Sequence, residues 1–193
     1  NIPHAFNEAV KLHQAGDIAG ADKLYARVLE IDPDHVDALS NRGLTLVSLG
    51  RFEDAIPCIE KAISITPNAA DLNFNLGTAL DELWRYDDAT KAYQRCIELA
   101  PDYAPAHYNL AGLMMSASRP LDAVKHYRDA ISAYPGYVEA HFGLGVAFQD
   151  AGEFEEAVKS YRQTIIYEPN HAGAHANMGF SLKELGQFEG AHE

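Results

Sequence analysis

The chain has 193 residues, of which 47 % are apolar and 22 % are charged; this composition is typical of a folded protein with a sizeable core. The 28 acidic residues outnumber the 15 basic ones and give a formal net charge of −13, which disfavours nonspecific binding to nucleic acid and to anionic membranes. The apolar runs are far shorter than the ~20 residues that cross a bilayer, and fourteen glycines and nine prolines are too few for a collagen-like or low-complexity chain.

Three columns of residues recur in register, which indicates an internal repeat of 34 residues. The recurring prolines are Pro33, Pro67, Pro101, Pro135 and Pro169. The alanines that stand twelve residues before them are Ala21, Ala55, Ala89, Ala123 and Ala157, and the column continues with Ala191. Tyrosine stands eight residues before four of the prolines, at Tyr25, Tyr93, Tyr127 and Tyr161, and Ile59 takes the fifth place.

Each repeat predicts two helices. If the recurring proline is position 32, apolar residues at positions 4, 7, 8 and 11 form one face of a first helix, and positions 20, 24 and 27 form one face of a second. The turn between the helices is marked by Gly16, Gly50, Gly152 and Gly186. The residues expected to cap the next first helix are Asp34, Asn68, Asp102, Gly136 and Asn170. Because one pair cannot bury both apolar faces, neighbouring repeats must stack.

Three repeats depart from this pattern. Pro57 lies inside the predicted second helix of its repeat, where it removes one hydrogen bond and bends the helix. Trp84 replaces the turn glycine, and we expect it to pack over a neighbouring helix, with ligand stacking as the alternative. In the following repeat Ser118 and Arg119 replace the usual turn, and Pro120 stands at the start of a helix, where proline is tolerated.

Stretches such as Asn75-Leu76-Gly77, and Ala89 to Tyr93, resemble the signature of the tetratricopeptide repeat family. The resemblance covers residues 1–193 as a single array. Its repeats are residues 2–35, 36–69, 70–103, 104–137 and 138–171, with a partial repeat at 172–193. The resemblance implies an all-α fold, a right-handed superhelical solenoid of antiparallel helix pairs, and a role as a protein–protein interaction module and scaffold.

The nine histidines raise the question of a metal site. His107, His141 and His175 occupy one position in three successive repeats, but equivalent positions of stacked helices lie about 8–10 Å apart, too far to share an ion. We predict that they are packed, hydrogen-bonded core residues. His171 and His175 are four residues apart, but His171 stands at the helix entry. The sequence therefore predicts no metal site and no cofactor.

The cysteines indicate the cellular compartment, and the missing catalytic motifs bear on whether the protein is an enzyme. Two cysteines, Cys58 and Cys96, cannot form a disulfide framework or a four-ligand zinc site, so we expect buried thiols in a reducing compartment, the cytoplasm. The sequence has no nucleophile elbow, phosphate loop or glycine-rich dinucleotide turn. We therefore predict no catalytic residues and no enzymatic activity for this segment.

One column, at position 6, is not explained by the predicted core. It contains Asn7, Asn41, Asn75, Asn109 and Asn177, and Gly143 interrupts it. On a helical wheel this position lies opposite the core face, and the family resemblance implies that it lines the concave surface of the superhelix. A row of amides can both donate to and accept from a peptide backbone, and the arrays of O-linked N-acetylglucosamine transferases carry a similar asparagine column. The alternative is that each amide bonds to the adjacent repeat and stiffens the stack.

Position 5 borders the same face and carries Phe74, Tyr108 and Phe142. These rings are candidates for side-chain pockets, with packing against the next helix as the alternative. Lysine and arginine are missing from positions 2, 5 and 6, where the family's clamp for a C-terminal carboxylate needs them, so a chaperone-tail receptor is disfavoured.

The predicted function is to bind an extended or helical peptide segment of a partner protein in the concave groove. Acidic residues in the first helical turns, Asp37, Asp71 and Glu139, favour a partner that is not itself acidic. One alternative is the substrate-recognition part of a larger enzyme such as a glycosyltransferase. Another is a self-assembling scaffold whose ends associate through apolar residues such as Met178 and Leu182.

Overall fold

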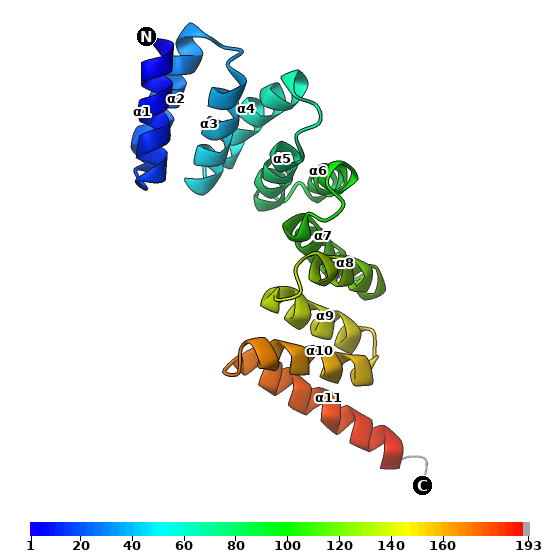
Figure 1. Ribbon diagram of the computed structural model, residues 1–193. Coiled ribbons are helices and arrows are strands. Elements are labelled where there is room, and N and C mark those ends of the chain that lie inside the picture. The colour runs from blue at the N-terminus through cyan, green and yellow to red at the C-terminus, as the bar shows by residue number, and fades with distance from the viewer. Residues whose placement is uncertain (191–193) are drawn as a thin grey trace. The chain divides into compact units, whose positions relative to one another are not determined.

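The computed structural model describes residues 1–190, with side chains up to residue 186, and over this range it contains eleven helices and no strand (Figure 1). The first helices of the repeats are α1 (Ile2–Gln14), α3 (Val36–Ser48), α5 (Ala70–Glu82), α7 (Ala104–Ser116), α9 (Val138–Asp150) and α11 (Ala172–Gly190). The second helices are α2 (Ile18–Ile31), α4 (Phe52–Ile65), α6 (Tyr86–Leu99), α8 (Pro120–Ala133) and α10 (Phe154–Tyr167). The predicted all-α helix-pair fold is confirmed.

The helices group into two compact units, Asn1–Pro101 and the residues from Asp102 onward. In the first unit each of α2 to α6 packs on the helix before it, and α3 also contacts α5. In the second unit each of α8 to α11 packs on the helix before it, and α9 contacts both α7 and α11. The first helices α3, α5 and α9 are therefore contacted on two sides, by the second helix of their own repeat and by that of the repeat before.

The core of each repeat lies between its two helices. Positions 20, 24 and 27 are buried in all five second helices, as predicted: Ala21, Tyr25, Val28, Ala55, Ile59, Ala62, Ala89, Tyr93, Cys96, Ala123, Tyr127, Ala130, Ala157, Tyr161 and Thr164. The residue at position 24 lies on position 8 of the first helix. A Cβ atom on Gly77 would come within 2.6 Å of the Tyr93 ring, and one on Gly43 within 2.5 Å of Ile59. The small residues at position 8 are therefore required by this close approach.

First helices also bury a face that the helical wheel does not predict. Positions 3 and 10 are buried in α3 (Ala38 and Thr45) and in α5 (Leu72 and Ala79). This face packs on the second helix of the preceding repeat, α2 for α3 and α4 for α5. Position 6 lies three residues after position 3 and four before position 10, so it lies on the same side of the helix.

The turns inside the repeats share one left-handed residue. Gly16, Gly50 and Gly152 have φ values of 84°, 69° and 78°, and Trp84 and Ser118 adopt φ values of 60° and 56° at the equivalent places. Trp84 is 80 % exposed, so the prediction that it packs over a neighbouring helix is wrong. The prediction of a turn at Gly186 is also wrong, because α11 continues to Gly190.

The predicted helix caps are displaced by one residue. The N-cap positions are His35, Ala69, Tyr103 and Tyr137, because the residue after each proline belongs to the turn that precedes the helix. His35 caps through its ring, since Nδ1 accepts a hydrogen bond from the Ala38 amide at 3.3 Å. Pro120 is the first residue of α8, as predicted, and Pro57 lies inside α4.

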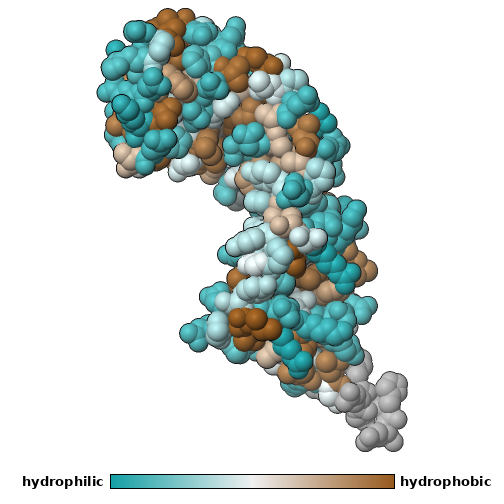
Figure 2. All heavy atoms as spheres, in the orientation of Figure 1, coloured by the Kyte–Doolittle hydropathy of each residue, from teal (hydrophilic) through white to brown (hydrophobic). Residues whose placement is uncertain are grey.

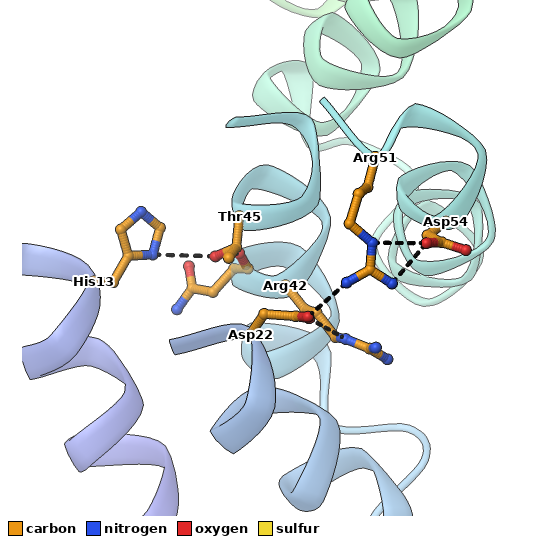
Figure 3. Close-up of polar contacts among 7 residues, drawn as sticks. His13, Asp22, Arg42, Thr45, Arg51 and Asp54 are labelled. Carbon is orange, nitrogen blue, oxygen red and sulfur yellow. Dashed lines mark hydrogen bonds and ion pairs between the residues drawn. The ribbon is translucent and has the colours of Figure 1, made fainter. Parts of the chain in front are cut away.

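A buried carboxylate joins the first two repeats (Figure 3). Asp22 of α2 accepts hydrogen bonds from Arg42 Nε of α3 at 2.9 Å and from Arg51 Nη1, just before α4, at 3.0 Å. Arg51 also donates to the exposed Asp54. One acidic side chain thus ties together three successive helical segments.

On the face shown in Figure 2, polar side chains are interspersed with separate apolar patches. Exposed apolar residues such as Ile31, Leu121 and Ile166 come from different helices. None of the described helices has the length and apolar character needed to span a membrane.

Candidate peptide-binding face

The asparagine column lies on the first helices, on the face that turns toward the preceding repeat. Asn7 is exposed, because α1 packs mainly on α2, the second helix of its own repeat. Asn41, Asn75, Asn109 and Asn177 are half-buried. For Asn41, Asn75 and Asn177 the position is therefore not a freely solvated face opposite the core, as the helical wheel predicts, but the edge of the contact with the preceding repeat.

At the last described junction the amide belongs to a polar network. Asn177 Nδ2 donates to Tyr161 Oη at 3.4 Å, and Tyr161 Oη donates to Gln149 Oε1 at 3.1 Å. The buried Ser181 hydroxyl donates to the same Gln149 oxygen at 3.3 Å. Burial raises the pKa of Tyr161 to about 12, so the phenol keeps its proton and acts as a donor. Here the asparagine joins two repeats.

The first junction uses the same four positions. Tyr25 is fully buried, His13 Nδ1 lies 3.4 Å from Thr45 Oγ1, and Asn41 lies beside Tyr25. Burial raises the pKa of Tyr25, and the neighbouring Asn41 amide partly offsets this. Among the described residues the Tyr25 hydroxyl has no hydrogen bond of normal geometry. The Asn41 amide is therefore a neighbour of the phenol rather than a firmly bonded partner.

Two other junctions differ from this arrangement. At Gly143, where the column is interrupted, a Cβ atom would come within 2.6 Å of the Tyr127 ring, so the ring fills the space that an asparagine would need. Asn75 stands sixteen residues after Ile59, where other repeats have tyrosine. Its side chain makes no hydrogen bond within the described part of the chain. Asn109 has an interaction within the chain. Asn7 and Asn75 therefore have no hydrogen-bonding partner among the described residues, and Asn41 has only the loose contact with Tyr25.

The aromatic residues at position 5 are half-buried and contact the tyrosine at position 24 of their own repeat. The ring centroids of Phe74 and Tyr93, Tyr108 and Tyr127, and Phe142 and Tyr161 lie 5.8 to 5.9 Å apart. Tyr108 also contacts Tyr137 at 5.0 Å, and Phe142 contacts His171 at 4.6 Å. One side of each ring is therefore used in packing, and the remaining surface borders the asparagine column.

The histidine column behaves largely as predicted. His107 and His141 are buried. His141 Nε2 lies 2.8 Å from the Pro135 oxygen, and His175 Nε2 lies 2.8 Å from the Pro169 oxygen. His175 is exposed, because α11 is covered on that side by no further helix in the described range.

The sequence analysis missed one cluster of chemically active side chains. His107, His126 and Asp129 have ligand atoms within 4.8 Å of one another. The comparison of histidines within one column did not include residues of the second helix. The signal was present as two ligand-type residues three apart, His126 and Asp129, in a repeat that also has histidine at position 4.

The cysteines are free thiols. Cys96 is fully buried, and Cys58 is half-buried. Burial raises the pKa of both, to about 11 for Cys96. The prediction of a buried thiol is confirmed for Cys96.

Comparison with known proteins now identifies the family. The sequence profile of the tetratricopeptide repeat (TPR) matches residues 6–70, 40–104, 74–138, 108–175 and 142–192. The chain belongs to the tetratricopeptide repeat family. Two crystal structures of MamA are similar to this TPR protein. One is 30 % identical, covers 89 % of this chain and 93 % of its own, and has a TM-score of 0.80. The other is 31 % identical, covers 85 % and 96 %, and has a TM-score of 0.79.

A third solved structure, YrrB, shares the TPR fold at 24 % identity and a TM-score of 0.76, with 89 % of each chain covered. No curated protein sequence matches the chain. Family membership makes this protein a repeat scaffold of the kind that presents extended surfaces to other proteins.

Proposed function

We propose that this TPR array binds an extended or helical peptide segment of a partner protein along the face formed by its first helices, which lines the concave groove expected of the family. Asn75 carries the proposal. It is a half-buried amide without a hydrogen-bonding partner in the described range, next to the half-buried Phe74. An amide that both donates and accepts matches a peptide backbone, and an adjacent ring offers contact to a side chain.

The comparisons give this proposal some support. YrrB is described as "a TPR protein with an unusual peptide-binding site", and its fold is shared by this chain. The chain has a net charge of −13. Three of its acidic residues lie in the first turns of first helices: Asp37 in α3, Asp71 in α5 and Glu139 in α9. The preferred partner is therefore a basic or neutral segment.

The test uses a random-peptide display library selected on the immobilised chain, followed by affinity measurement with one selected peptide. Asn75→Ala removes one possible amide hydrogen bond, worth ~0.5–1.5 kcal/mol, so affinity should fall roughly two- to tenfold with the melting temperature unchanged or raised. Asn177→Ala is the matched control, because its amide already bonds to Tyr161, and it should lower the melting temperature.

Two outcomes would contradict parts of the proposal. If Asn75→Ala leaves the affinity unchanged while selected peptides still bind, the ligand surface lies outside the asparagine column. Selection of acidic peptides would contradict the charge argument alone.

Self-assembly is a second candidate, favoured by α11. Its residues Phe180 and Leu182 are 48 % and 45 % exposed, and the only contact of the Phe180 ring with another described ring is the edge-on one with Phe154. The third candidate, a substrate-recognition part of a larger enzyme, uses the same groove chemistry. A catalytic domain in the full-length gene would favour it.

A further inference from the structure

Three side chains that can bind a metal ion meet on the second unit, between α7 and α8. His107 comes from α7, and His126 and Asp129 come from α8, three residues apart and therefore on one helix face. His107 Nδ1 lies 3.4 Å from His126 Nδ1 and 3.8 Å from Asp129 Oδ2. All three ligand atoms lie within 4.8 Å of one another.

These separations match the coordination sphere of zinc. Bonds of about 2.0–2.2 Å in a tetrahedral arrangement place neighbouring ligand atoms roughly 3.3–3.5 Å apart. The two imidazole nitrogens already have this spacing. The carboxylate lies 3.8 Å from His107 Nδ1 and within 4.8 Å of the His126 ligand atom. Because the Asp129 side chain is 43 % exposed, it can rotate inward to close this gap.

The two imidazoles can each offer a ring nitrogen to a metal ion. His107 is buried within the helix pair. A neutral imidazole has a lone pair for a metal, and Asp129 adds a negative charge that attracts a cation.

The other described repeats show that the TPR fold does not need this cluster. At the three equivalent positions they have Ala5, Leu24 and Arg27; Leu39, Cys58 and Lys61; Asn73, Ala92 and Arg95; and His141, Ser160 and Gln163. Only the repeat at residues 104–137 combines three ligand-type side chains. His141 has the same place and burial as His107 but faces no second histidine or carboxylate at these positions, and its Nε2 bonds to Pro135.

We propose that His107, His126 and Asp129 bind one Zn²⁺ ion, with a water molecule as the fourth ligand. Two imidazoles and one carboxylate with an open position form a donor set that suits zinc. The site tightens the contact between α7 and α8 without being required for folding, because the equivalent pairs in the other repeats form without it.

The test begins with the 193-residue chain, freed of metal by a chelator and titrated with ZnCl₂ in a calorimeter. We expect one ion per chain, an increase in melting temperature, and unchanged helical circular dichroism before zinc is added. His126→Ala should weaken zinc binding at least about tenfold. His175→Ala is the matched control: it removes a histidine from the same column as His107, two repeats further on, and should bind zinc as the unmodified chain does.

A second variant keeps the test decisive if His126→Ala is poorly folded. Asp129→Asn changes a half-exposed side chain, so it should fold and still lose affinity. With Co²⁺ in place of zinc, the unmodified chain should show the visible absorption of a tetrahedral ion, and Asp129→Asn should not. Equal zinc affinity in the unmodified chain, His126→Ala and Asp129→Asn, or zinc binding lost only in His175→Ala, would overturn the proposal.

Discussion

Trp84 holds a backbone conformation that other repeats give to glycine. Its φ of 60° lies in the left-handed region, which costs an L-residue roughly 1–2 kcal/mol, and with 80 % exposure the indole recovers little of this by burial. Trp84→Gly should therefore raise the free energy of unfolding by about 0.5–1 kcal/mol, after the entropic penalty of glycine. Urea denaturation measures the change.

Gly16→Ala provides the reverse control for Trp84→Gly. Gly16 has a φ of 84° with no atom near its missing Cβ, so only backbone strain is added, and stability should fall. If Trp84→Gly is destabilising instead, the indole makes a stabilising contact that its exposure conceals.

Burial of Cys96 links stability to alkaline pH. Its pKa is raised from 9.0 to about 11 by burial first and by Asp71 second. As the pH increases from 9.0 towards 11, the unfolded chain loses this proton before the folded chain does, so the free energy of unfolding decreases. Urea denaturation across this window should show a smaller decrease for Cys96→Ala than for the unmodified chain.

The reactivity of the thiols checks the same point independently. In the native protein a thiol reagent should modify Cys96 slowly, and urea should make it reactive. Rapid modification of native Cys96 below pH 9 would contradict its burial. The pKa values of the buried Tyr127 and Tyr161 are raised from 10.0 to about 12, so these tyrosines also reduce stability from pH 10 upward. The comparison with Cys96→Ala separates the contribution of the thiol from theirs.

At the scale of helices, Asp22 is the residue whose loss should matter most in the first two repeats. Its side chain is 11 % exposed and binds two arginines. Asp22→Ala leaves both guanidinium groups without this partner and should lower the free energy of unfolding by about 1.5–3 kcal/mol, as measured in urea.

Asp54→Ala is the matched control for this network, because Asp54 binds the same Arg51 from an exposed position three residues away. Exposed pairs of this kind contribute little, so its effect should be much smaller. Equal effects of the two variants would show that Asp22 acts no differently from a surface charge.

The arrangement of the helix pairs could be predicted because position 8 and positions 20, 24 and 27 repeat throughout the chain. The buried face at positions 3 and 10 could not be predicted, because a helical wheel of one helix contains no information about the helix that precedes it. Asn41 and Asn177 were therefore expected opposite the core, yet they lie at contacts between repeats. The helix N-caps were predicted one residue too early for a related reason. The side chain of Asp34 is of a type that caps helices, but Asp34 belongs to the turn around Pro33 and the N-cap is His35.

At the scale of the whole molecule, the 34-residue period identified the family, while the candidate sites depend on individual departures from that period. Asn75 is available because Ile59 replaces a tyrosine, and His107 meets His126 and Asp129 in one repeat only. Such combinations involve residues on different helices, so they became visible only when the structure placed the helices side by side.

The exposed apolar residues of α11 predict concentration-dependent association. Phe180 and Leu182 are large and about half-exposed, and such surface favours burial against another molecule. Sedimentation should show an average mass that rises with protein concentration. Leu182→Lys should reduce this rise without loss of helix. A mass independent of concentration in the unmodified chain would contradict the prediction.

The polar networks have a consequence for how repeats can be rearranged. Each network is divided between neighbours: one repeat supplies the tyrosine and its partner, such as Tyr161 and Gln149, and the next supplies the hydroxyl and the amide, such as Ser181 and Asn177. Repeat 36–69 presents polar groups toward the repeat before it and Val47 and Ile59 toward the repeat after it. The contact surface of a repeat is therefore of one of two kinds, polar or apolar, and two repeats can be joined without loss only where their facing surfaces are of the same kind. An artificial array that joined repeat 2–35 directly to repeat 70–103 would set Tyr25 and His13 against Ala79, whereas one that joined repeat 138–171 to repeat 36–69 would match Tyr161 and Gln149 with Asn41 and Thr45.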